Sequence, residues 1–234
     1  MTWQPLPKPG PGPAPVPQPG GTGVPGTVIY DSHINSHLHN GVVRRFTTEG
    51  NLECRASGNP YIQVNADGTF SLWDSDLGRF YLYVNNYNVM LELVWAFGNS
   101  PSGTNLSLKI RSRHNEGGDC SNRFGGYGFA MTRTQYDAKR EPCHNIHDES
   151  LGGNLPKNLG TGQYHQIQFS VKDMPKPTQT AVLDGVRVRQ WTDTNPAPYM
   201  INQAMYAARS YIWVRQNTTA LTEIRIKSLR MIAI

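Results

Sequence analysis

Cations occupy every second position, 109, 111 and 113, in the stretch 106–113, which reads LSLKIRSR and has apolar residues at 106, 108 and 110. Alternation with a period of two is typical of a half-buried strand, and it predicts that Lys109, Arg111 and Arg113 share one face of that strand. A second strand is predicted at 123–131, where three glycines within four residues leave room for something to approach closely. If the two strands pair symmetrically about their loop, Arg111 stands near Tyr127. The two strands therefore predict a cationic, aromatic contact surface.

Similar alternation recurs in two later stretches that carry hydrogen-bonding side chains. In the stretch YHQIQFSV, Gln166 and Gln168 are expected on the outward face. An Asp-Gly turn further on predicts a tight hairpin that presents Arg187, Arg189 and Trp191 together. Arginine and lysine form charge-assisted hydrogen bonds to carboxylate or sulfate, and aromatic rings stack on the faces of sugars. The predicted binding residues are Lys109, Arg111, Arg113, Tyr127, Gln166, Gln168, Arg189 and Trp191.

A catalytic use of such residues is the alternative to binding. β-Elimination from a uronate needs a group that neutralises the carboxylate, a base that removes the proton from the adjacent carbon, and an acid that protonates the leaving oxygen. Arg111 and Gln166 are the candidates for holding the carboxylate. His114 or His144 could act as the base, and Tyr127 as the acid. Hydrolysis of a glycoside is less favoured, because no predicted strand carries an outward pair of carboxylates. A solvated exterior face would produce the same alternation without any function.

The cysteines and histidines predict no metal site. Cys120 and Cys143 lie in polar loops on either side of the glycine-rich strand, and a disulfide between them is one alternative. The other is that these two residues and Cys54 are reduced thiols. No histidine and cysteine spacing resembles a zinc site. No cofactor is predicted; a structural Ca²⁺ ion is the one alternative, and no motif supports it.

The 234-residue chain is basic, with a formal net charge of +5 and a pI near 9.2. This favours an anionic partner, but the basic residues are spread along the chain instead of forming a run. An acidic polysaccharide is therefore predicted ahead of nucleic acid. No apolar run approaches the ~20 residues that span a bilayer, so no membrane partner is predicted. An extracellular or virion-associated location is expected, although the first residues lack a signal-peptide pattern.

Residues 1–26 differ from the rest of the chain in composition, since they hold 9 of the 17 prolines. Proline lacks the N–H group and fixes φ, so this segment is expected to be extended, largely as polyproline II. It is either a linker or an anchoring arm that lies along a partner protein or another copy of the chain. Residues 27–234 are predicted to form one domain of roughly twelve strands without a helix, in which 136–162 is a long polar loop.

Four stretches in the predicted strand order resemble a known superfamily: 110–113 (IRSR), 164–169 (YHQIQF), 183–186 (LDGV) and 224–227 (IRIK). The chain resembles the concanavalin A-like lectin/glucanase jelly roll, whose members include lectin-like modules, glucanases and polysaccharide lyases of the alginate-lyase type. The resemblance implies an all-β fold, a two-sheet antiparallel β-sandwich with a concave sheet that binds glycans. It does not by itself imply catalysis.

Glycan binding is therefore the predicted function. The chain is expected to be a carbohydrate-binding module for an acidic polysaccharide, anchored through residues 1–26 to a larger assembly such as a virion or a surface filament. The alternative is a polysaccharide lyase that acts on a uronate-containing glycan by β-elimination. In the alginate-lyase pattern a histidine follows an outward glutamine two positions later. Here Gln168 follows Gln166, which favours binding over catalysis.

Overall fold

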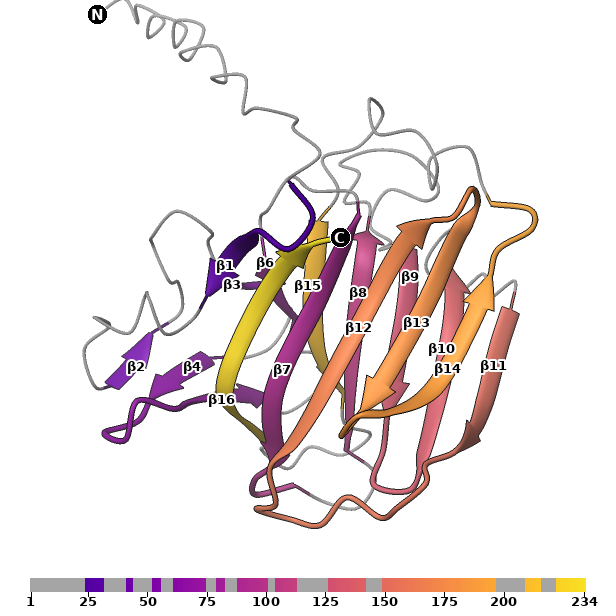
Figure 1. Cartoon of the computed structure of the whole chain (residues 1–234). Coiled ribbons are helices and arrows are strands. Elements are labelled where there is room, and N and C mark those ends of the chain that lie inside the picture. Colours follow the sequence, from indigo (N-terminus) through magenta and orange to yellow (C-terminus); the bar gives the residue numbers. More distant parts are fainter. Residues whose placement is uncertain are drawn as a thin grey trace, which may run out of the picture.

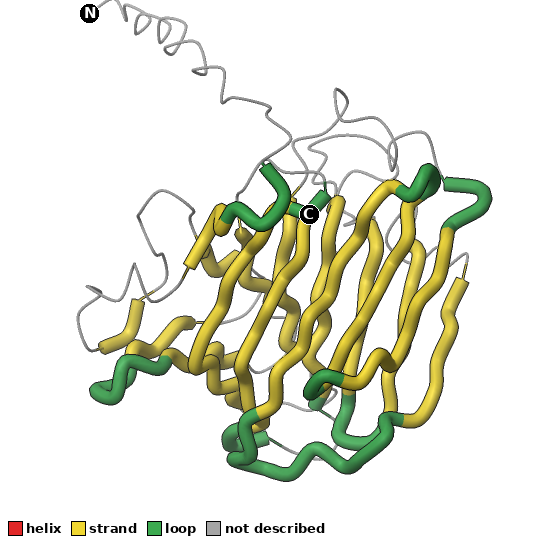
Figure 2. The backbone as a smooth tube through the Cα atoms, in the orientation of Figure 1, coloured by secondary structure: helices red, strands yellow, loops and turns green. Residues whose placement is uncertain are grey.

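The structure is a computed structural model that describes residues 24–31, 41–43, 52–55, 61–74, 79–82, 88–100, 104–112, 126–141, 149–196, 209–215 and 222–234. Every regular element in these ranges is a β-strand, and sixteen strands form two antiparallel sheets (Figure 2). No helix among these residues is long and apolar enough to cross a membrane.

Sheet A has nine strands, and its longest members lie at its centre. In spatial order it consists of β14 (Val186–Thr192), β13 (Pro177–Leu183), β12 (His165–Asp173), β7 (Val89–Phe97), β16 (Thr222–Ala233), β5 (Phe70–Asp74), β4 (Tyr61–Val64) and β2 (Gly41–Val43). The ninth strand, β1 (Val28–Asp31), pairs with β16 beyond the end of β5.

Sheet B has seven strands and lies behind sheet A in the view of Figure 1. In spatial order it consists of β11 (Glu149–Asn154), β10 (Gln135–Glu141), β9 (Gly126–Met131), β8 (Asn105–Ser112), β15 (Arg209–Arg215), β6 (Arg79–Leu82) and β3 (Leu52–Arg55). Strands β8 to β11 follow one another along the chain, whereas β15 joins from about a hundred residues later and separates β8 from β6.

The hydrophobic core fills the space between the two sheets, as the alternation predicts. Leu93 and Trp95 of β7 in sheet A have no exposed surface, and neither has Leu108 of β8 in sheet B. The rings of Phe129 on β9 and Phe169 on β12 stack with centroids 5.9 Å apart, so they join the sheets directly. Burial of a large apolar side chain stabilises a fold by about 1.5–3 kcal/mol, which makes this layer the main source of cohesion. The predicted all-β sandwich is confirmed.

Two strands of sheet B lie where a loop was predicted. Most of β10 and all of β11 fall within the stretch 136–162, so that prediction was wrong for these segments. The alternation is present in β10, because Ala138 is buried in the core while Asp137 and Lys139 line a cavity on the other face. Because the stretch is rich in polar residues, this alternation was not recognised in the sequence.

The N-terminal segment meets the end of the chain. The N–H of Gly26 donates a hydrogen bond to the carbonyl of Ala233 at 2.8 Å, and β1 then pairs with β16. Residues 1–23 of the predicted arm lie outside the described residues, so the anchoring role of residues 1–26 stays a prediction.

Candidate functional site

A β-bulge in β8 separates two cations that were predicted to share a face. Tyr211 of β15 pairs with Lys109, but Arg209 pairs with Ser112, so the bulge adds one residue to β8. Arg111 lies within this bulge and has a φ of 55°, a left-handed conformation that a non-glycine residue adopts only in a special local setting. The regular alternation therefore stops between Lys109 and Ser112.

Arg111 bridges the two sheets and does not join the row of Lys109. Its Nη1 lies 2.9 Å from Oδ1 of Asp173, and its Nη2 donates to Oδ1 of Asn88 at 2.7 Å. Asp173 ends β12 and Asn88 precedes β7, so both acceptors belong to sheet A. Arg111 is 3% exposed. The prediction that Lys109 and Arg111 lie in one exposed row was wrong, and Arg113 lies outside the described residues.

Tyr127 is a core residue with a buried polar partner. It pairs with Ile110, and both side chains are fully buried between the sheets. The Tyr127 hydroxyl donates a hydrogen bond to Oδ2 of Asp193 at 2.8 Å, while Oδ1 of Asp193 lies 2.9 Å from Nη1 of Arg140. The ring of Trp191 packs against the same cluster, with its centroid 6.3 Å from that of Tyr127. The expectation that Tyr127 faces outward beside the cations was therefore wrong.

We expect Tyr127→Phe to change stability and not glycan binding. Loss of the hydroxyl removes one hydrogen bond to a buried carboxylate, so the free energy of unfolding should fall by about 1–2 kcal/mol. Urea unfolding followed by tryptophan fluorescence measures this change. If the variant lost glycan binding while its free energy of unfolding stayed unchanged, Tyr127 would have a role in binding.

A groove lies on the outer face of sheet B, on the side of β8, β9 and β10 away from the core. It has a volume of about 220 Å³. Its polar lining residues come from β8 and β10, while β9 supplies small residues that keep it open. The lining residues of these strands include Asn105, Ser107 and Lys109 on β8, the small residues Gly128 and Ala130 on β9, and Gln135, Asp137 and Lys139 on β10.

Lys109 lies at the floor of this groove because Gly128 gives it room. A Cβ atom at position 128 would stand 3.4 Å from Cε and 3.6 Å from Cγ of Lys109. The predicted close approach to the glycine-rich strand is thus made by the lysine side chain. On the core side, Nε2 of Gln179 donates to the carbonyls of Gly128 (3.3 Å) and Lys139 (3.2 Å), which fixes β9 and β10 to sheet A.

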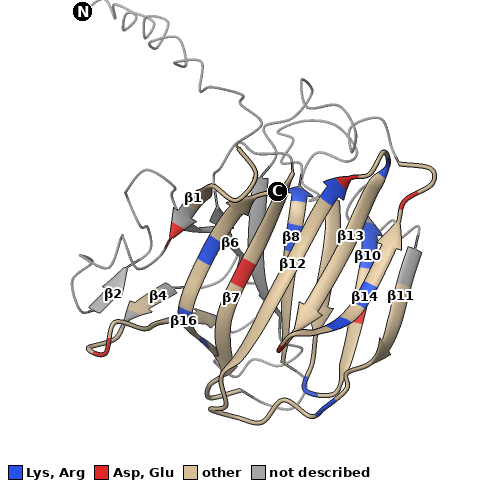
Figure 3. Cartoon of the chain, in the orientation of Figure 1, with Lys and Arg blue, Asp and Glu red and all other residues tan. Residues whose placement is uncertain are grey.

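The groove combines positive charge with neutral hydrogen-bonding groups. Lys109 is 3% exposed, and Nζ of Lys139 lies 3.0 Å from Oδ2 of Asp137. The basic colouring of β8 and β10 is seen in Figure 3. The amides of Asn105 and Gln135 add both donors and acceptors. Such a lining suits a ligand that carries hydroxyl groups and a negative charge.

The predicted glutamines lie on the opposite side of the molecule. Gln166 and Gln168 alternate with fully buried residues of β12, so they occupy the outer face of sheet A. Nε2 of Gln168 donates to Oε2 of Glu92 at 2.7 Å, and Arg230 pairs with the other carboxylate oxygen. Burial acts to raise the pKa of Glu92, but these hydrogen bonds outweigh it and hold that pKa below its ordinary value. Gln166 therefore cannot share a ligand with Lys109.

The β13–β14 hairpin does not present its three predicted residues together. Ala181 pairs with Arg189 and Val182 with Arg187, so a bulge separates the two arginines. Trp191 packs against the core beside Tyr127. None of them lines the groove. Five further predicted or related residues lie outside the described residues: Arg113, His114, Cys120, Cys143 and His144.

The chain resembles known proteins in its fold. No protein-family model matches the sequence, and no curated protein matches it. Among solved structures, alginate lyase A1-II′, a member of polysaccharide lyase family 7, matches with a TM-score of 0.54 and 13% identity over 73% of this chain and 82% of the lyase. The metal-free Emp46p carbohydrate recognition domain matches with a TM-score of 0.53 and 11% identity, over 76% of this chain and 87% of that domain.

The chain has the concanavalin A-like jelly-roll fold. In this jelly roll the predicted binding residues are dispersed over three places. Lys109 lies in the groove, Arg111 and Tyr127 lie between the sheets, and Gln166 lies on the outer face of sheet A. The predicted catalytic set is therefore not brought together among the residues that the structure describes.

The charged residues Asp137 and Lys139 are among the groove residues that were not predicted from the sequence. Asp137 and Lys139 belong to β10, which was taken as part of a loop. The signal that could have found them is the alternation of Tyr136 and Ala138 with these charged residues. Their use in the groove depends on β10 lying next to β9, which residue types alone do not fix.

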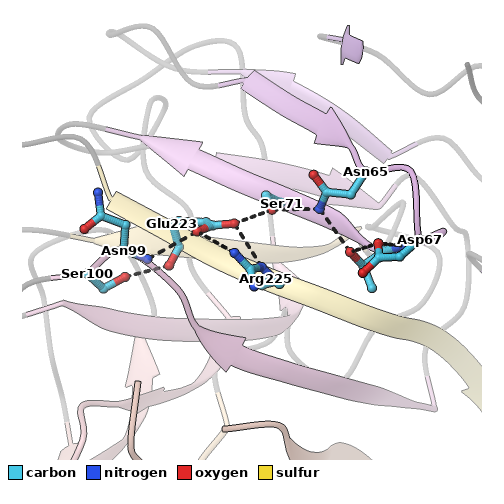
Figure 4. A network of polar contacts seen from close by, with 8 residues as sticks. Asn65, Asp67, Ser71, Asn99, Ser100, Glu223 and Arg225 are labelled. Carbon is cyan, nitrogen blue, oxygen red and sulfur yellow. Dashed lines mark hydrogen bonds and ion pairs between the residues drawn. The ribbon is translucent and has the colours of Figure 1, made fainter. Parts of the chain in front are cut away.

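A second polar network lies around Glu223 of β16 in sheet A (Figure 4). Glu223 of β16 is 4% exposed, and its carboxylate accepts hydrogen bonds from Ser71 Oγ (2.5 Å), the Asn99 N–H (3.2 Å) and Arg225 (3.2 and 3.3 Å). Gly98 lies beneath it, since a Cβ atom there would come within 2.6 Å of Cδ of Glu223. Burial acts to raise the pKa of Glu223, but the bonds from Ser71, Arg225 and Asn99 hold it below 4.5.

We expect Glu223→Gln to weaken the dependence of stability on acid. Because the folded carboxyl has a lower pKa than the unfolded one, it contributes to stability above the unfolded value of 4.5 and loses that contribution as pH falls through the folded pKa. The urea midpoint of the variant should be lower than that of the unmodified chain at neutral pH, and the two should converge as pH falls through the folded pKa of Glu223. Parallel pH profiles would contradict the assignment.

Proposed function

We propose that this chain is a carbohydrate-binding module and that the groove on sheet B takes an acidic polysaccharide. The single observation that carries the proposal is Lys109 on the floor of a polar groove, beside the Lys139–Asp137 pair. A lysine in such a position forms charge-assisted hydrogen bonds with a carboxylate or sulfate, while neighbouring amides bond to hydroxyl groups. The net charge of +5 favours the approach of a polyanion.

The fold relatives support this choice of ligand class. One is a carbohydrate recognition domain, and the alginate lyase has been observed with a product (GGG) and with a substrate (GGMG). A uronate chain carries one carboxylate per sugar and hydroxyl groups around each ring. These are the groups for which the groove supplies partners.

A panel of immobilised glycans tests the proposal. Alginate, pectate and sulfated polysaccharides should bind, neutral glucans should bind weakly, and added salt should weaken the binding of the acidic chains. Gly128→Val is the test variant and should weaken binding, because its side chain would enter the space beside Lys109 without altering the charge of the chain. Retention of full binding by a folded Gly128→Val variant, or equal binding of neutral and acidic glycans, would overturn the proposal.

Lyase activity is the second candidate, and one observation favours it. Tyr211 pairs with Lys109 across β15 and β8, so the two residues hold neighbouring register positions in sheet B. An ammonium group can neutralise a uronate carboxylate, and a tyrosine can exchange a proton with the substrate. Incubation with alginate or pectate, followed by ultraviolet absorbance of the unsaturated product, separates the two functions. If a glycan binds but causes no change in absorbance, the chain acts as a binding module and not as a lyase on that glycan.

The anchoring role is a separate part of the proposal. The proline-rich segment would hold the module in an extracellular or virion-associated assembly, through a partner protein or a second copy of the chain. Size-exclusion chromatography of the full chain and of a variant lacking residues 1–23 tests this, since Gly26 is hydrogen-bonded to the domain and should be kept. An unchanged elution volume together with unchanged partner binding would contradict the anchoring role.

A further inference from the structure

The groove on sheet B runs parallel to the strands, with β9 as its floor and β8 and β10 as its walls. The pairing register orders its residues into three rungs, because β9 pairs with β8 on one side and with β10 on the other. Directly paired residues of an antiparallel sheet share a face, so the members of a rung stand together on the groove face. In order, the rungs are Lys109, Gly128 and Lys139, then Ser107, Ala130 and Asp137, then Asn105 and Gln135.

The third rung lies at the hairpin that joins β9 to β10. Leu106 pairs with Met131, so Asn105 lies one residue further toward this hairpin. The N–H of Thr132 donates to the carbonyl of Gln135 at 2.9 Å, which places Gln135 at the same end. Two residues of a strand span about 7 Å, so the three rungs extend over about 14 Å. The groove is therefore long enough to contact more than one sugar of a polysaccharide.

The charge of the groove changes along its length. The first rung holds two lysines, the second an aspartate, and the third only two neutral amides. Nζ of Lys139 lies 3.0 Å from Oδ2 of Asp137, so this lysine already shares its charge with the second rung. The side chain of Lys109 crosses the floor of the first rung at Gly128. Two lysines and one aspartate give the described lining a net charge of +1, which matches one anionic group at the first rung.

The second and third rungs favour neutral sugars. The side chain of Asp137 is 32% exposed, so a ligand can reach it. A second carboxylate of the ligand would meet this carboxylate, and like charges that face each other oppose binding. A sugar hydroxyl would instead donate a charge-assisted hydrogen bond to Asp137. The amides of Asn105 and Gln135 donate and accept hydrogen bonds, so they also suit hydroxyl groups.

We propose that the groove selects an acidic polysaccharide in which one uronate is followed by neutral sugars. This inference rests on the proposed binding function and names the ligand class within it. Lys109 binds the carboxylate, while Asp137 determines specificity, because it repels a charged sugar at the second rung and binds a hydroxyl of a neutral one. A chain with a carboxylate on every sugar still meets Lys109, but it brings a like charge to Asp137. The groove thus selects for the spacing of charge along the polysaccharide.

Calorimetric titration with trigalacturonates that differ only in methyl esterification tests the inference, since an ester keeps the sugar ring and removes its charge. The trisaccharide with one free carboxylate, on a terminal sugar, should bind about three- to tenfold more tightly than the fully acidic trisaccharide. In Asp137→Asn, the fully acidic trisaccharide should bind at least as tightly as the singly charged one. Asp67→Asn is the matched control, because it changes the net charge equally at an exposed turn between β4 and β5, and it should leave the preference unchanged.

The outcomes separate this selectivity from the binding function. A preference for the singly charged trisaccharide that Asp137→Asn abolishes and Asp67→Asn keeps supports the inference. Equal or tighter binding of the fully acidic trisaccharide by the unmodified chain would overturn the inference and leave a glycan-binding groove. A preference retained by folded Asp137→Asn would overturn it as well. Failure of every trisaccharide to bind would overturn both proposals for uronates. The comparison of ligands on the unmodified chain keeps the test valid if Asp137→Asn does not fold.

Discussion

Lys109→Met should lower the affinity for acidic oligosaccharides by about tenfold to a hundredfold, the largest effect on binding expected from any single change in the groove. Methionine keeps the length of the side chain and its packing over Gly128 but removes the ammonium group. A hydrogen bond to a charged group contributes more than a neutral one, and Lys109 is 3% exposed, so water replaces little of what is lost. Calorimetry with oligoalginate measures the change.

The control for this prediction is a lysine on the other sheet. Lys227 of β16 is exposed on the outer face of sheet A, where its Nζ lies 5.9 Å from the ring of Tyr164. Lys227→Met changes the net charge by the same amount, and it should alter affinity by less than about twofold because exposed charges are screened by salt. Equal losses in the two variants would show that overall charge, and not the groove, accounts for binding.

Asp193→Ala should produce the largest loss of stability, about 3–5 kcal/mol, because it leaves a buried arginine without its carboxylate. The side chain of Asp193 is 1% exposed and that of Arg140 is 11% exposed. The substitution also removes the acceptor of the Tyr127 hydroxyl and of the Asn195 N–H. The free energy of urea unfolding measures the change.

Asp137→Ala is the matched control for Asp193→Ala. Asp137 also pairs with a cation of β10, but both of its ion-pair side chains are partly exposed, at 32% and 23%. An exposed ion pair contributes only about 0–1 kcal/mol, so this variant should remain close to the unmodified chain in stability. Equal destabilisation by the two substitutions would contradict the buried role of Asp193.

The fold was predictable because the alternation of apolar residues is strong in the central strands. In β7 and β12, the residues that alternate toward the core, such as Leu93 and Phe169, are fully buried. The turn at Asp184-Gly185 has positive φ at both positions, as an Asp-Gly hairpin requires. Local patterns and turn chemistry therefore carried enough information for a sandwich of two antiparallel sheets.

The site was harder to predict because register and bulges are not local. Tyr127 was expected near Arg111 but pairs with Ile110, and a shift of one residue moves every side chain of a strand to the other face. Arg111 has a left-handed φ but is neither a glycine nor an asparagine, so its residue type does not indicate the bulge. The neighbour of β8 on its other side is β15, whose position depends on the whole chain.

The most direct test of the groove is a map of where a glycan touches the chain. Backbone amide chemical shifts, recorded during titration with oligoalginate, should change mainly in β8, β9 and β10. Amides of β7 and β12 around Glu92 and Gln168 should remain unchanged. Shifts that cluster on those sheet A strands, and leave Lys109 and Gly128 unaffected, would contradict a binding groove on sheet B.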